Sequence, residues 1–264
     1  MQFHEYGSED SRTLLIMHGM ICDWRRFREL FQPLEQDYRV IYHAMNGCYD
    51  GAPDFRSFAD ECTELEQYLM ENHNGRLDVA VGVSQGATLM AVLASRNNVS
   101  IDKAILDGVY AAHQGKLCAY LALKAFLRMQ AIGGAPSRAF IKALPLMGLD
   151  ESDLDEFRLM YWNAGRESMK ANLIENYTWR VPAGFRIDHT KVYLWCGSKE
   201  PYAPKTHLYY GSAETVYAFA PSYAESFKNL MQNAGYMSER ECITAMLCSF
   251  PFPDADRHST RSWN

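Results

Sequence analysis

A chain of 264 residues, 48% apolar and 22% charged, is long enough to bury a sizeable core and has the length and composition of one globular domain. The net charge of -6 provides no basic surface to attract a phosphate backbone, so we expect no nucleic acid partner. The N-terminal segment lacks the basic and apolar regions of a signal peptide, and no apolar run reaches the roughly 18 residues of a membrane span. We therefore expect a cytoplasmic protein.

The seven cysteines are odd in number and form neither a CxxC pair nor a cluster with nearby histidines. This predicts reduced, mostly structural thiols and no metal site. The sequence also lacks a dinucleotide-binding fingerprint, so we expect no cofactor. The sequence does not indicate an oligomeric state.

Short apolar runs alternate with segments of helical period in the first half of the chain, which is the pattern of βαβ units and a parallel sheet. The expected strands are residues 13–17, 39–44, 78–83, 103–107, 191–196 and 214–219. Residues 55–72 carry apolar side chains at three- and four-residue steps, which predicts an amphipathic helix, and residues 85–95 are expected to form another. The fold class is therefore α/β, with a mostly parallel central sheet and flanking helices.

A block of helical pattern, rich in Met, Leu, Phe and Tyr, occupies residues 111–186 before the strand pattern returns. Helices between two strands of one sheet form an insertion. Two interpretations stay open, a structural bundle and a cap that faces substrate. The expected organisation is a core of residues 1–110 and 187–233, this insertion, and a C-terminal extension of residues 234–264.

The segment Gly82-Val83-Ser84-Gln85-Gly86 matches G-x-S-x-G and lies between an expected strand and an expected helix. A serine in that context stands on a sharp turn, and side chains two positions to either side would collide with neighbouring backbone. Glycines at both positions remove the collision. The pattern predicts that Ser84 is a nucleophile, with an ordinary glycine-lined turn as the alternative.

Upstream, an expected strand runs directly into His18, Gly19 and Met20. With the G-x-S-x-G segment about 65 residues later, a helical insertion and two final strands, the chain resembles the α/β-hydrolase superfamily over most of its length. The resemblance implies an α/β-hydrolase fold with a helical cap. It also implies that the backbone N–H groups of Met20 and Gln85 form an oxyanion hole, which stabilises the charge on a carbonyl oxygen under attack.

The resemblance also implies a catalytic acid and a histidine, in the chain order Ser, acid, His. Glu200 holds the acid position, in the loop after the strand at 191–196. A solvated loop carboxylate is the other interpretation of Glu200, and Asp107 at the end of an earlier strand is the competing acid.

The expected histidine position, after the last strand, is occupied by Tyr223, and the usual glycines are absent. A phenol with a pKa near 10 is ionised only about one part in a thousand at pH 7, so Tyr223 would be a feeble base. His258 satisfies the chain order, and His113 enters the insertion directly after a strand; both stay open as the base. His18 belongs to the oxyanion loop and is expected to be structural.

The leading hypothesis is a serine hydrolase that cleaves a small ester or related acyl substrate. Ser84 would attack the carbonyl, Glu200 would orient the base, and water would release the acyl group. The alternative is a catalytically impaired protein that binds a small apolar ligand in a pocket of the insertion, because Tyr223 stands where histidine is expected. A lyase or haloperoxidase has less support, since the nucleophile is Ser and not Asp.

Overall fold

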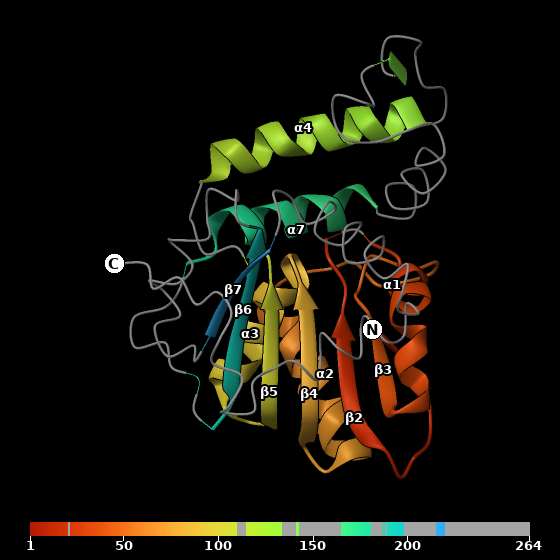
Figure 1. Cartoon of the computed structure of the whole chain (residues 1–264). Helices are drawn as coiled ribbons and strands as arrows, with labels where there is room; N and C mark the ends of the chain where they lie inside the picture. Colours follow the sequence, from red (N-terminus) through yellow and green to blue (C-terminus); the bar gives the residue numbers. More distant parts are fainter. Residues whose placement is uncertain are drawn as a thin grey trace.

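The computed structural model shows one sheet with helices on both faces and at its carboxyl end (Figure 1). The residues that the structure describes are 1–20, 22–109, 115–133, 141–142, 165–180, 187, 189–197 and 215–219.

Seven strands form the sheet, in the order β1-β3-β2-β4-β5-β6-β7. They are β1 (Gln2–Tyr6), β2 (Arg12–Met17), β3 (Tyr38–Ala44), β4 (Arg76–Val83), β5 (Ser100–Asp107), β6 (Lys191–Gly197) and β7 (Thr215–Phe219). All neighbours pair in parallel except β1, which pairs antiparallel with β3. The six strands expected from the sequence are confirmed, and β1 is an additional edge strand.

The helices bounded by the structure are α1 (Trp24–Phe31), α2 (Phe58–His73), α3 (Gln85–Arg96), α4 (Lys116–Gly133) and α7 (Arg166–Thr178), with a short 3-10 helix η1 (Gln32–Gln36). The two expected helices are confirmed as α2 and α3. The first begins three residues later than expected, because the Ser57 hydroxyl caps it by accepting a hydrogen bond from the Asp60 N–H at 3.1 Å. Of the described helices, none combines the length and apolarity required to cross a membrane.

Both faces of the central strands are buried, which explains their continuous apolar sequence. In β2, Leu15 and Met17 belong to the core cluster under α2 and α3, whereas Leu14 and Ile16 belong to the cluster on the face of α1. The sheet is therefore the middle layer of three, and its central strands are held rigidly between two cores.

Helix α7 lies across the carboxyl ends of the central strands, and α4 runs along its outer side (Figure 1). The two helices pack through Leu123 of α4 and through Met169 and Leu173 of α7. The partly buried side chain of Met20 packs against the same cluster. Both helices come from the part of the chain expected to be an insertion. They bring apolar side chains to the edge of the sheet where β4 ends.

Candidate active site

Ser84 stands on the turn between β4 and α3, with φ 54° and ψ -113°. Non-glycine residues rarely adopt a positive φ, because such a conformation costs about 1–3 kcal/mol and persists only where the surrounding structure holds it. The surroundings here do so: the Ser84 N–H donates to the Asp107 carbonyl at 2.7 Å, and the Ser84 carbonyl accepts from the first turn of α3. Ser84 is exposed, whereas Gln85 is buried. The turn therefore presents the serine side chain to solvent from an otherwise buried junction.

The glycines on either side of Ser84 allow this turn because a side chain at either position would strike backbone. A Cβ on Gly82 would lie 2.4 Å from the Gly86 carbonyl oxygen. A Cβ on Gly86 would lie 2.3 Å from the Met17 carbonyl oxygen and 2.6 Å from that of His18. The collision expected from the sequence pattern is thus present at both glycines, and Gly86 allows α3 to start directly against the end of β2.

The positive φ predicts an unusual order of stability for two variants. Ser84→Gly is expected to be about 1 kcal/mol more stable than Ser84→Ala, because glycine adopts this conformation freely and alanine keeps the strain. Urea unfolding of both variants measures the difference. Gln67, an exposed residue in the middle of α2, supplies the control: there Gly should be about 1 kcal/mol less stable than Ala. The same order at both positions would contradict the strain at Ser84.

The loop after β2 lies beside Ser84. A Cβ on Gly19 would be 3.7 Å from both the Ser84 Cβ and the Val83 carbonyl oxygen. The strands that precede the two segments are direct neighbours, with Met17 opposite Gly82 in the register. Met20 and Gln85, whose N–H groups were expected to form an oxyanion hole, therefore lie on adjacent segments at the same edge of the sheet.

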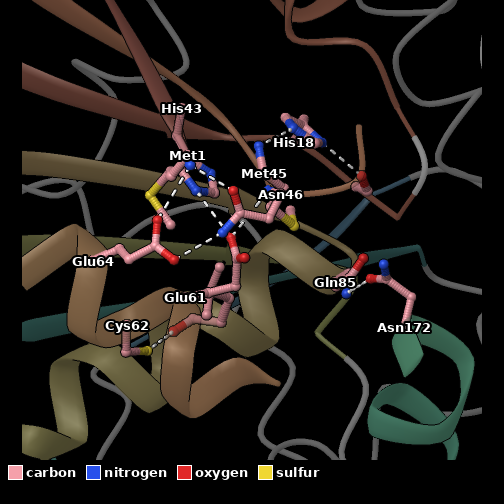
Figure 2. A network of polar contacts seen from close by, with 12 residues as sticks. Met1, His18, His43, Met45, Asn46, Glu61, Cys62, Glu64, Gln85 and Asn172 are labelled. Atoms are coloured by element: carbon pink, nitrogen blue, oxygen red, sulfur yellow. Dashed lines mark hydrogen bonds and ion pairs between the residues drawn. The ribbon is translucent and has the colours of Figure 1, made fainter. Parts of the chain in front are cut away.

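The His18 side chain fastens this loop to the end of β3 (Figure 2). Its Nδ1 lies 2.8 Å from the Gly19 carbonyl oxygen and its Nε2 accepts a hydrogen bond from the Met45 N–H at 3.2 Å, which makes Nδ1 the protonated nitrogen. Burial, reinforced by the neighbouring His43, lowers the pKa of His18 to about 4. Both ring nitrogens are occupied, so the side chain is structural, as the sequence suggested.

The lowered pKa of His18 predicts a pH-dependent contribution to stability. Because the folded pKa is below that of the unfolded chain, the native state binds fewer protons, and stability falls as pH falls from 6.5 toward 4. Of the two titratable neighbours of the ring, His43 lowers the pKa of His18 and Asp23 raises it. His18→Asn does not titrate, so the excess unfolding free energy of the wild type over this variant should shrink by about 2–4 kcal/mol between pH 7 and pH 4. The measurement is urea unfolding of both proteins at several pH values. A difference in unfolding free energy that stays constant from pH 7 to pH 4 would contradict the prediction.

The other described histidines contact groups other than Ser84 or lie at the amino end of the sheet. The ring of His4 stacks on Trp24 at 3.7 Å between centroids, and the Nε2 of His73 is 2.9 Å from a Glu5 carboxylate oxygen. His43 is fully buried, with its Nε2 3.7 Å from a Glu61 oxygen (Figure 2). His189 precedes β6 and therefore lies at the amino end of the parallel strands, whereas Ser84 follows the carboxyl end of β4.

The remaining residues expected at the site lie outside the described residues. They are Glu200, Tyr223, His258 and His113. Asp107, the competing acid, is described: it is buried at the carboxyl end of β5, where its carbonyl accepts the Ser84 N–H. Within the described part of the chain, His, Cys, Asp and Glu side chains do not gather in threes around a position that could hold a metal ion.

Two residues of the site edge were missed from the sequence, Asn172 and Asn176 of α7. The side-chain amide of Gln85 donates to the Asn172 Oδ1, and the Asn176 Nδ2 lies 3.7 Å from the Met20 sulfur. Asn172 is 2% exposed. The local signal in the sequence was the four-residue spacing of Ser168, Asn172 and Asn176, which places three polar side chains on one face of the helix.

No protein-family model matches the sequence, and no curated protein matches it. Solved structures do resemble it. An α/β hydrolase family protein from Desulfitobacterium hafniense is 20% identical, with a TM-score of 0.70 and coverage of 93% of this chain and 100% of that protein. A hydrolase from Pseudomonas aeruginosa PA01 is 14% identical, with a TM-score of 0.70 and 93% coverage of both chains.

A third similar structure is that of a carboxylesterase from the ammonia-oxidizing thaumarchaeon Nitrososphaera gargenis. It is 17% identical, with a TM-score of 0.64, and the match covers 94% of this chain and 95% of that protein. At these identities the likeness concerns the fold. The match covers 93% or more of each of these proteins. Together with the seven-stranded, mostly parallel sheet and the helices on both of its faces, it shows that the chain has the α/β-hydrolase fold.

Proposed function

We propose that the protein is a serine hydrolase that cleaves a small ester or related acyl substrate through an acyl-enzyme on Ser84. The observation that carries the proposal is the exposed Ser84, held at a positive φ between a parallel strand and a helix. This geometry presents a nucleophile at the top of the sheet in hydrolases with a G-x-S-x-G turn. The likeness in fold to a carboxylesterase favours an ester as the substrate class.

In the proposed reaction the Ser84 hydroxyl attacks the substrate carbonyl carbon and gives up its proton to a base. The carbonyl oxygen becomes an anion, which the N–H groups of Met20 and Gln85 stabilise, and the N-terminal end of α3 favours the same negative charge. The tetrahedral intermediate collapses as the base protonates the leaving alcohol. Water then attacks the acyl-enzyme, returns a proton to Ser84 and releases the acid.

The proposed base is one of the histidines outside the described residues, His258 or His113, with Glu200 or Asp107 as the acid that orients it. The placement of the described histidines supports this restriction, because His18 uses both ring nitrogens in structural hydrogen bonds and is neutral near pH 7. A neutral imidazole accepts the serine proton only if one nitrogen is free.

The substrate that fits this site best has an apolar acyl or alkyl group. Met20 follows the loop beside Ser84, and its side chain packs partly against the cluster of Leu123, Met169 and Leu173 between α4 and α7. These two helices would form part of a cap over the substrate. Apolar walls next to a polar reacting centre are typical of sites that bind small organic molecules.

The test is turnover of a series of p-nitrophenyl esters, from acetate to octanoate, in the stopped flow. The expected result is saturable hydrolysis with an initial burst of p-nitrophenol, which reports an acyl-enzyme. Absence of turnover with every ester, combined with saturable quenching of tryptophan fluorescence by the same compounds, would contradict the proposal and favour the small-ligand-binding protein.

A further inference from the structure

One face of α7 carries three polar side chains at intervals of four residues, Ser168, Asn172 and Asn176. Ser168 and Asn172 are 1% and 2% exposed. The Asn172 Nδ2 donates to the Ser168 carbonyl at 3.0 Å, and the Asn176 Nδ2 donates to the Asn172 carbonyl at 2.9 Å. These bonds to the preceding turn orient both amides, and they leave the Asn172 Oδ1 free to accept from another element.

The acceptor oxygen of Asn172 meets the side chain of the residue that follows Ser84. The Gln85 Nε2 donates to the Asn172 Oδ1, and Figure 2 shows the two side chains pointing toward one another from α3 and α7. Gln85 is 1% exposed, and its Oε1 has no hydrogen-bond partner in the structure described. Loss of the hydrogen bond to Asn172 would leave the whole buried amide of Gln85 unsatisfied, which is costly, so the position of the Gln85 side chain depends on Asn172.

The next residue on the same face of α7 reaches the other proposed oxyanion residue. The Asn176 Nδ2 lies 3.7 Å from the Met20 Sδ, a contact in which the thioether is a weak acceptor. The Met20 side chain also packs against the apolar cluster that contains Leu173 of α7. Helix α7 therefore touches the side chains of both Met20 and Gln85.

Helix α7 is hydrogen-bonded to the segment before α2 and to the first residue of α2. The Ser168 hydroxyl donates to the Asp54 carboxylate at 2.5 Å and accepts from the Phe55 N–H at 3.2 Å. One turn beyond Asn172, a Glu175 carboxylate oxygen accepts from the Phe58 N–H at 3.1 Å. Contacts to the core on both sides of Asn172 make α7 a rigid support.

We propose that Asn172 and Asn176 are positioning residues, which hold Gln85 and Met20 so that α7 sets the geometry of the oxyanion hole. The inference rests on the proposed function. Two donor N–H groups must stay within a few tenths of an ångström of the position where charge develops, and each comes from a different segment. A single rigid helix that contacts both residues links the two segments to one another.

The test measures the kinetics of ester hydrolysis in Asn172→Ala, with Lys170→Ala as the matched control on the exposed side of the same helix. The expected result for Asn172→Ala is a fall in kcat of about tenfold with KM changed by less than about twofold, because the donors act on the transition state and not on the bound ester. The inhibition constant of an alkyl trifluoromethyl ketone, which forms the oxyanion, should rise in parallel. That of the unreactive alkyl methyl ether should stay constant.

A swap of the two amides separates positioning from simple stability. Gln85→Asn and Asn172→Gln exchange the lengths of the two side chains and keep the hydrogen bond, so the double variant should recover most of the kcat lost in each single variant. Asn176→Ala should lower kcat less than Asn172→Ala, because the contact to sulfur is weaker. All variants are compared at temperatures well below their unfolding midpoints.

Each outcome decides the inference. A kcat for Asn172→Ala equal to that of Lys170→Ala, or equal rises of the inhibition constants of both compounds, overturns it while the proposed function stands. Failure of the double variant to recover activity overturns it as well. A wild type that neither hydrolyses esters nor reacts with a fluorophosphonate overturns the proposed function, and this inference with it.

Discussion

Replacement of Ser84 by alanine is expected to lower kcat for ester hydrolysis by roughly 10⁴-fold or more, because the proposed acyl-enzyme forms on the serine oxygen that this change removes. The loss should occur without unfolding: the turn is held by backbone hydrogen bonds, the Ser84 N–H to the Asp107 carbonyl and the Ala87 and Thr88 N–H groups to the Ser84 carbonyl. Steady-state kinetics with p-nitrophenyl butyrate measures the effect, and circular dichroism checks the fold.

Ser95→Ala is the matched control for this change. Its hydroxyl lies in the same helix and donates to the Val92 carbonyl at 2.8 Å, one turn earlier, away from the junction with β4. This variant should keep the wild-type kcat. Residual hydrolysis in Ser84→Ala within tenfold of the wild type would mean that another group performs the reaction.

Gly86→Ala is expected to damage both stability and activity. The added methyl group would lie 2.3 Å and 2.6 Å from two backbone carbonyl oxygens of the β2 end, and backbone cannot turn aside as a side chain does. We expect a loss of about 3 kcal/mol or more in the free energy of unfolding. Because α3 must move away from the oxyanion loop, kcat should also fall by about a hundredfold.

Gly165→Ala is the control for the glycine prediction. A Cβ at that position would meet one atom, an Asp54 carboxylate oxygen at 3.6 Å, which is an ordinary van der Waals distance. Its unfolding free energy should therefore fall by less than about 1 kcal/mol, the cost of alanine in place of glycine at this N-cap of α7. Equal effects at Gly86 and Gly165, measured by urea unfolding, would contradict the close approach of α3 to β2.

The parallel strands were predictable because burial on both faces leaves a continuous apolar signal, as in Leu14 to Met17 of β2. The edge strand β1 was missed because none of its five residues is fully buried and they include Glu5 and His4. Helix α1 was missed because it is short and rich in arginine. Its N-cap, Asp23, which accepts from the Arg25 N–H at 2.9 Å, was the available signal.

The nucleophile turn was predictable because its requirements are local: Gly82, Ser84 and Gly86 decide the backbone path within five residues. The support from α7 was not, because Gln85 and Asn172 are 87 residues apart and only the fold brings them together. A base could not be assigned from local pattern either, since Tyr223 stands where the resemblance expects histidine. Choice among distant histidines depends on tertiary placement.

The central claim, that Ser84 is an activated nucleophile, is tested most directly by covalent labelling. The protein is incubated with a fluorophosphonate, its intact mass is recorded over time, and the modified peptide is sequenced by tandem mass spectrometry, with Ser84→Ala as the control. We expect a single adduct on Ser84 that forms within minutes at neutral pH and is absent from the variant. An unmodified wild type, or an adduct that persists in Ser84→Ala, would contradict the account.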